Sequence, residues 1–199
     1  MSLRNWRIVV AVATCLGCPA AAATAQPSSG DAAPFHSEWL VLGGIGTDAR
    51  STSGRQVAFQ SVEWGRNLSG EHGPGVLKGQ LEMVIEVTPV FVAFQSGHAE
   101  GAGFAPVMFR WNFRPHRAIE PFVDAAAGMV VTNRDVPENT TRMNFSEHFG
   151  VGARFRVAER WAVVAGYRLH HVSNNGTAAR NPGVTSHVGY AGVSWMITQ

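Results

Sequence analysis

Residues 107–113 read Val-Met-Phe-Arg-Trp-Asn-Phe, and residues 81–87 read Leu-Glu-Met-Val-Ile-Glu-Val. Both segments place large apolar side chains at every second position, with charged or polar residues at several of the positions between. Because successive side chains of a β-strand point to opposite faces, each segment predicts a strand with one apolar face and one partly charged face. A helix would need apolar residues three or four positions apart, so the spacing favours β-structure.

Similar alternating segments continue along most of the chain, separated by short clusters rich in Gly, Pro, Asn and Asp. This pattern is typical of antiparallel strands joined by tight turns. It predicts an all-β fold, an eight-stranded antiparallel transmembrane β-barrel of the outer-membrane type. The expected strands are residues 35–46, 56–66, 76–94, 102–113, 119–132, 140–156, 161–173 and 183–197.

The charged face of these strands is expected inside the barrel, because the outer face of a membrane barrel meets lipid. Eight strands enclose an interior that side chains can fill, and buried charges are expected to be paired. We therefore predict a structural network of ion pairs, which argues against a porin-like channel. Its expected members are Glu82, Glu86, Arg110, Asp124 and Arg168.

Tryptophan positions support a membrane barrel independently of the alternation. If the N-terminus is periplasmic, Trp39 and Trp161 begin outward strands, while Trp64, Trp111 and Trp195 end returning strands. All five would then lie at the periplasmic end. An aromatic girdle is expected at such a membrane interface.

The first 25 residues have the features of a secretory signal. Arg4 and Arg7 precede an apolar run, and an Ala-Thr-Ala cleavage motif ends at Ala25. Both cysteines lie within this leader, so the mature protein is expected to have no disulfide or cysteine metal site. The expected organisation is a signal peptide at 1–25, a short polar segment at 26–34 and the barrel at 35–199.

Charge and composition exclude several classes of protein. After residue 25 the basic and acidic residues are equal in number, so no basic field is present to attract nucleic acid. No apolar run approaches the ~20 residues of a transmembrane helix. The scattered histidines lack the spacing of metal ligands, and we predict neither a metal nor a cofactor.

Two polar residues lie on the lipid-facing side of the seventh expected strand. The apolar alternation through Tyr167 and Leu169 continues into His171 and Ser173. Residues two apart share a strand face, near enough for an imidazole to accept a proton from a serine hydroxyl. The pair predicts a nucleophile and its base at the outer end of the wall, although polar residues also occur at strand ends in the headgroup zone.

A third group would orient the imidazole and stabilise its cation. Glu147 lies on the lipid-facing side of the sixth expected strand. The tight hairpin at 156–160 places Glu147 either directly opposite His171 or one diagonal step away. Glu147 is therefore either the orienting acid of this histidine or an interfacial charge.

The residues around this pair form a longer motif. His170-His171-Val172-Ser173-Asn174 is followed by Asn181-Pro182-Gly183 just before the last strand. This pattern resembles the PagL family of lipid A 3-O-deacylases, acyloxyacyl hydrolases of the outer membrane. The family signature is His-x-Ser-Asn on the penultimate strand and Asn-Pro-Gly before the last one. The motifs cover about the last thirty residues, and the earlier strands agree in number and style.

The resemblance implies an esterase that removes a 3-O-linked hydroxyacyl chain from the lipid A of lipopolysaccharide. It assigns Ser173 as nucleophile and His171 as general base, with Asn174 and Asn181 near the oxyanion. The family's catalytic Glu comes two residues after the Gly of Asn-Pro-Gly, where this chain has Thr185. A threonine can accept a hydrogen bond from the histidine but cannot offset an imidazolium charge.

Two outcomes follow from this departure. Either Glu147 supplies the carboxylate, or the site is weak or inactive and the barrel has a structural or lipid-binding role. Thr185 favours the second outcome, whereas the intact motifs favour the enzyme. The expected surroundings are lipopolysaccharide and the outer membrane after signal cleavage, with no nucleic acid, and with association into a homo-oligomer left open.

Overall fold

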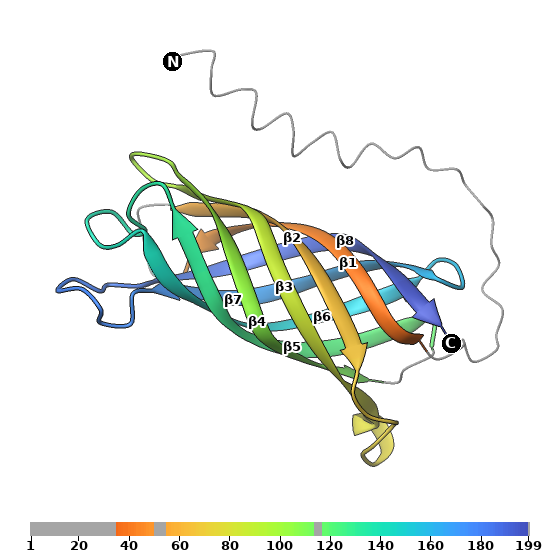
Figure 1. Cartoon of the computed structure of the whole chain (residues 1–199). Coiled ribbons are helices and arrows are strands. Elements are labelled where there is room, and N and C mark those ends of the chain that lie inside the picture. The colour runs from red at the N-terminus through yellow and green to blue at the C-terminus, as the bar shows by residue number, and fades with distance from the viewer. Residues whose placement is uncertain (1–34, 50–54, 114–116, 199) are drawn as a thin grey trace.

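The computed structural model describes residues 35–49, 55–113 and 117–198, and these form a closed antiparallel barrel (Figure 1). Each strand pairs with its neighbours in the sequence, and the last strand pairs with the first. The predicted eight-stranded barrel is confirmed. The predicted signal peptide and polar segment lie outside the described residues. The strands are β1 (Phe35–Asp48), β2 (Gln56–Asn67), β3 (Gly79–Phe94), β4 (Ala99–Phe113), β5 (Ile119–Thr132), β6 (Met143–Arg156), β7 (Trp161–Ser173) and β8 (Val184–Thr198).

The observed strand bounds lie close to the expected ones, with the largest differences at three strand starts. β3 begins at Gly79 rather than at residue 76, because the 3-10 turn η2 (Gly75–Leu77) occupies the start of that segment. β6 begins three residues late, at Met143, and β4 begins three residues early, at Ala99. These differences fall in the connections and leave the pairing of the strands unchanged.

Apolar side chains cover the outside of the barrel. Val41, Ile45, Phe109 and Phe149 are among many large apolar residues that are exposed on the outer face. A closed barrel leaves no unpaired sheet edge, which is the condition for β-strands to cross hydrocarbon. The outer surface therefore fits a lipid bilayer. Among the described residues, no helix is long and apolar enough to cross a membrane.

Charged side chains fill the half of the barrel interior that lies nearer the tryptophans. The alternation predicted charged residues in the interior. Arg110 donates hydrogen bonds to Glu63 at 2.6 Å and to Glu38 at 3.2 Å, and it lies 3.5 Å from Asp124. Arg168 donates to Glu63 at 2.6 Å and to a further carboxylate on β3. The five predicted members are all buried, and each of them takes part in ion pairs: Glu82, Glu86, Arg110, Asp124 and Arg168.

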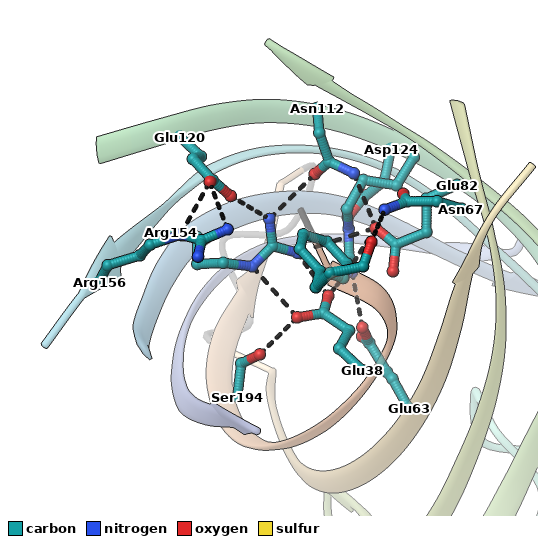
Figure 2. Close-up of polar contacts among 12 residues, drawn as sticks. Glu38, Glu63, Asn67, Glu82, Asn112, Glu120, Asp124, Arg154, Arg156 and Ser194 are labelled. Atoms are coloured by element: carbon teal, nitrogen blue, oxygen red, sulfur yellow. Dashed lines mark hydrogen bonds and ion pairs between the residues drawn. The ribbon is translucent and has the colours of Figure 1, made fainter. Parts of the chain in front are cut away.

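The network is larger than the sequence indicated. Figure 2 shows Arg154 between Glu38 and Glu120, with Asn112 completing its contacts. Arg154 donates to Glu120 at 3.0 Å and to Asn112 at 3.2 Å. Glu38 also accepts a hydrogen bond from Ser194. Since Glu38 and Ser194 come from β1 and β8, the network joins the first and last strands.

Tryptophans gather at the end of the barrel opposite Ser173. Trp39 is the register partner of both Trp64 and Trp195, and Trp195 is in turn the partner of Trp161. The rings of Trp161 and Trp195 stack with their centroids 6.4 Å apart. With Trp111 at the same end of β4, this arrangement is the predicted girdle.

Between this girdle and the outer end of the barrel, β2 differs from the other strands, because apolar residues point inward and polar residues point outward. Its inward side chains include the buried Val57 and Phe59, which join an apolar cluster inside the barrel. Its outward positions include Gln56 and Gln60. The register also shifts by one residue between Gln60 and Val62. Such a bulge changes local twist and cannot be located from alternation alone.

The connections at the outer end are tied to one another. The Gln95 side chain donates to the Asp135 carbonyl at 2.7 Å, which joins the β3–β4 turn to the β5–β6 connection. The hydroxyl and the backbone N–H of Ser96 both donate to the Glu138 carboxylate. These hydrogen bonds lower the pKa of Glu138 below its usual range.

Candidate active site

The candidate site lies at the outer end of the wall formed by β6, β7 and β8, which are neighbours in the barrel (Figure 1). On β7, Tyr167 and Leu169 are exposed, and the same outer face carries His171 and Ser173. The residues between them, Arg168 among others, point into the interior. The structure therefore brings the predicted serine and histidine to one lipid-facing surface.

Thr185 holds the imidazole of His171. The two residues are register partners on β8 and β7, and the His171 Nδ1 lies 2.9 Å from the Thr185 Oγ1. Because Nδ1 is engaged by this hydrogen bond, Nε2 is the nitrogen left to accept a proton from another group. The threonine thus occupies the orienting position that the family motif assigns to a carboxylate.

Gly183 brings the other edge of this imidazole and Ser173 to one small space. A Cβ atom on Gly183 would lie 3.3 Å from the His171 Nε2 and 3.6 Å from the Ser173 Cβ. It would also lie only 2.8 Å from the His171 Cε1, which is too close. Gly183 has a φ of 62°, a conformation that other L-residues rarely adopt. Only glycine satisfies both conditions, which explains its place in the Asn-Pro-Gly motif.

Asn174 organises the connection between β7 and β8. Its side chain is buried and donates to the Arg180 carbonyl at 2.9 Å, and its Oδ1 accepts from the Gly176 N–H at 3.0 Å. Its backbone N–H donates to the Asn181 Oδ1 at 3.2 Å. The carboxamide of Asn174 therefore serves the connection itself.

Asn181 is oriented by the same contacts. Its Oδ1 is the acceptor from Asn174, so the amide group is held by one end. Within the part of the chain that the structure describes, its Nδ2 has no hydrogen-bond partner. The side chain is exposed beside Gly183, and Nδ2 can donate to a bound group.

Glu147 lies on the other side of His171 from Thr185. Glu147 and His171 are direct register partners on β6 and β7, which is one of the two arrangements expected from the hairpin. Glu147 is exposed on the outer face. Among the described residues no hydrogen bond joins its carboxylate to the imidazole. The histidine thus has a hydroxyl partner on one strand and a carboxylate neighbour on the other.

A second polar pair lies on the same wall, one register step farther from the outer end. His187 is the register partner of Leu169, and its Nδ1 is hydrogen-bonded to the Tyr167 hydroxyl. The two rings stack with centroids 5.9 Å apart. The sequence indicated that both residues face outward. It did not indicate that they meet diagonally across two strands.

A third polar pair lies inside the barrel. The Ser146 Oγ and the His170 Nε2 are 2.8 Å apart, and both residues border a small internal cavity. His170 also lies edge-on to His148 and Phe91. Although His170 is adjacent to His171 in the sequence, strand alternation directs the two rings to opposite sides of the wall.

No group of three metal-binding side chains in the described ranges is arranged to hold a metal ion. The chemistry that the outer site can perform is acid-base and nucleophilic. It offers a hydroxyl nucleophile, an imidazole whose orientation is fixed, and an amide donor in the adjoining β7–β8 connection.

Comparisons with known proteins identify the family and the fold. A family model described as lipid A 3-O-deacylase (PagL) matches residues 43–194, a span that includes all of the candidate site residues. A search of curated protein sequences found no match.

Solved structures show the same fold at low sequence identity. The outer membrane enzyme PagL is 18% identical, with a TM-score of 0.57 over 77% of this chain and 97% of that one. The N-terminal β-barrel domain of Pseudomonas aeruginosa OprF is 12% identical, with a TM-score of 0.51 over 83% and 99%. Neisserial surface protein A is 12% identical, with a TM-score of 0.50 over 81% and 97%.

Proposed function

The chain belongs to the lipid A 3-O-deacylase (PagL) family, and from this we propose that it is an outer-membrane hydrolase that removes the 3-O-linked hydroxyacyl chain of lipid A. The observation that carries the proposal is the convergence of Ser173 and the His171 Nε2 on the space beside Gly183. That space opens on the lipid-facing wall at its outer end. A membrane lipid can reach it without leaving the bilayer.

The proposed reaction begins with attack by the Ser173 hydroxyl on the carbonyl carbon of the acyl ester. As the new bond forms, the hydroxyl proton passes to the His171 Nε2. When the tetrahedral intermediate collapses, the bond to the sugar oxygen breaks and the imidazolium returns its proton to that oxygen. The acyl chain is then held as an ester of Ser173.

Water completes the cycle. His171 takes a proton from a water molecule as that water attacks the acyl-serine carbonyl. The bond to the Ser173 Oγ then breaks, the imidazolium returns its proton to that oxygen, and the hydroxy fatty acid is released. The outer end of the wall lies at the headgroup level, where water is available. Neither half of the reaction requires a cofactor.

We assign oxyanion stabilisation to Asn181 and a positioning role to Asn174. Among the described residues the Asn181 Nδ2 has no partner, and the side chain is held against the backbone of Asn174, next to Ser173. A donor aimed at the developing oxyanion commonly contributes 10²–10³ in rate, on the order of 3–4 kcal/mol. Asn174 holds Asn181 and the rest of the connection in place through hydrogen bonds.

The imidazolium formed during the reaction needs a negative partner. Thr185 fixes the ring through Nδ1 but carries no charge. Glu147 is the directly opposed residue on β6, so we assign the electrostatic part of this role to Glu147. Orientation and charge would then come from two different strands.

The test is release of hydroxy fatty acid from purified lipid A in mixed micelles, followed by mass spectrometry. The wild-type protein should release the acid, whereas Ser173→Ala and His171→Ala should not. His98→Ala, which changes a histidine in the β3–β4 connection, should keep full activity. Activity retained by Ser173→Ala would rule out this nucleophile.

A second candidate function is a non-catalytic barrel that binds lipid. Thr185 in the family's acidic position is the observation that favours it. In that case the folded wild-type protein would retain lipid A in a pull-down from micelles but release no fatty acid.

A further inference from the structure

Tyr167 and His187 form a polar pair on the lipid-facing wall, between the candidate active site and the tryptophan girdle. Tyr167 lies midway along β7 between Ser173 at the outer end and Trp161, so it is level with hydrocarbon rather than with headgroups. Its hydroxyl is hydrogen-bonded to the His187 Nδ1, and both side chains are exposed on the outer face. Polar groups at this depth are unfavourable, because hydrocarbon offers them no partner, and they commonly mark functional sites.

The hydrogen bond between the two side chains leaves part of each group unused. A neutral imidazole has one N–H donor and one acceptor nitrogen, and a tyrosine hydroxyl both donates and accepts. If the hydroxyl donates to Nδ1, the His187 Nε2–H and the Tyr167 oxygen stay available. If the Nδ1–H donates instead, the Tyr167 O–H and the His187 Nε2 stay available. In either tautomer, one residue therefore offers a donor and the other offers an acceptor.

A hydroxyl group on a lipid chain is complementary to this pair. It can accept a hydrogen bond from the spare donor of one residue and donate its own proton to the spare acceptor of the other. An ester carbonyl can only accept, and a methylene chain can do neither. The pair therefore favours a hydroxyl over the other groups that an acyl chain brings to this part of the wall.

The pair lies on the path of an acyl chain that runs from the reaction space into the bilayer. His171 and Thr185 form the register row beside that space, and Leu169 and His187 form the next outward row toward the girdle. Successive outward positions of a strand are about 7 Å apart, and side chains lean along the strand. A hydroxyl on one of the first few carbons of the chain therefore comes within reach of His187.

We infer that Tyr167 and His187 bind the hydroxyl of the hydroxyacyl chain and make the enzyme selective for chains that carry it close to the ester. The inference rests on the proposed function, because it assigns substrate selectivity to residues beside the same site. Neither residue touches the reacting atoms, so their role is to position the substrate. A chain held at its hydroxyl has a fixed depth, which places its ester carbonyl beside Ser173.

The test compares three synthetic lipid A monosaccharides in mixed micelles, which differ only in the 3-O-linked acyl chain. The chains have equal length and carry a hydroxyl on the third carbon, on the terminal carbon, or nowhere. The wild type should hydrolyse the first substrate with a kcat/KM about tenfold higher than the other two. The substrate with the terminal hydroxyl controls for polarity, because its hydroxyl cannot lie beside His187 when the ester is at Ser173.

Variants of the pair should change the preference and not the basal reaction. Tyr167→Phe and His187→Leu should each reduce the preference to less than about threefold, with an unchanged kcat/KM on the chain without a hydroxyl. His187→Gln keeps a donor and an acceptor and should keep most of the preference. Gln60→Leu makes a polar-to-apolar change on the outer face of β2, across the barrel from β6, and should keep all of it.

The outcomes separate this inference from the proposed function. A wild type that hydrolyses all three substrates equally well would overturn the inference and leave the proposed function intact. A Tyr167→Phe variant with the full preference of wild type would do the same. If the folded wild type hydrolyses none of the three, the proposed function is wrong and the inference falls with it.

Discussion

Gly183 is the residue whose substitution tests the site geometry most narrowly. Gly183→Ala should lower kcat/KM at least 100-fold, because the new methyl group would occupy the space between His171 and Ser173 and the φ of 62° would be strained. Gly189→Ala on β8 is the control, since a Cβ there meets nothing within 4 Å. Equal activity of the two variants in the micelle assay would contradict the geometry.

Thr185 allows the charge at the orienting position to be restored. Thr185→Glu should restore at least tenfold of the kcat that Glu147→Gln loses, because a carboxylate beside the His171 Nδ1 would then stabilise the imidazolium. Thr185→Val should lower kcat, because the hydrogen bond is lost. Initial rates at saturating lipid A measure both changes. A Glu147→Gln, Thr185→Glu double variant no faster than Glu147→Gln alone would contradict this division of roles.

Glu147 is the proposed source of that charge. Glu147→Gln should lower kcat at least tenfold with little change in KM, because the side chain acts through His171 and not on the lipid. Glu100→Gln, at the outer end of β4, should have no effect. If Glu147→Gln is fully active, the carboxylate is an interfacial charge with no part in the reaction.

The sequence predicted the placement of single residues correctly where strand alternation alone determines which face a residue occupies. His171 and Ser173 lie on one outer face, and Arg168 points inward, as their parity requires. The sequence could not predict the roles of Asn174 and Gly183, because these roles depend on hydrogen bonds and a backbone angle within one connection.

The β7–β8 connection is the element that positions the reaction space. Asn174→Ala would remove the two side-chain hydrogen bonds that hold it, so the Gly176 amide should exchange with solvent faster and activity should fall at least tenfold. Arg180→Ala is the control, because Asn174 bonds to the backbone carbonyl of Arg180. Hydrogen exchange followed by mass spectrometry distinguishes them, and unchanged exchange in Asn174→Ala would contradict this role.

Strand number, order and the β6–β7 register were accessible from the sequence, because hairpins with short turns constrain which residues face each other. Bulges were not accessible. The register shifts near Gln60, Glu86 and Val107 each add one residue to a strand. The kinds of residue in the strand give no sign of the addition. The alternation of polar and apolar residues in β2 was weak, because its inward residues near the outer end of the barrel are apolar.

For the whole molecule, the interior network is expected to set stability. Arg110→Met would remove one of the two arginines that Glu63 contacts and a shared partner of Glu38 and Asp124, so the free energy of unfolding should fall by about 3–5 kcal/mol. Arg142→Met removes an exposed arginine and should change it by less than about 0.5 kcal/mol. Urea unfolding in detergent micelles measures both. Equal stability of the two variants would show that the network does not hold the barrel together.

The general character of the interior could be predicted, but its full membership could not. Alternation identified Arg110 and Arg168, whereas Glu38 and Arg154 lie on strands whose pattern is broken by apolar inward residues and glycines. Which charges meet across the interior is a property of barrel closure, and it depends on pairings between strands far apart in the sequence.

The central claim is that the outward-facing serine, and not the inward-facing Ser146 with its hydrogen-bonded His170, carries the reaction. Mass spectrometry of lipid A from cells producing wild type, Ser173→Ala or Ser146→Ala tests it most directly. We expect lipid A to lose one hydroxyacyl mass with wild type and with Ser146→Ala, and to stay intact with Ser173→Ala. Intact lipid A with a folded wild-type barrel, or loss of the chain with Ser173→Ala, would contradict the account.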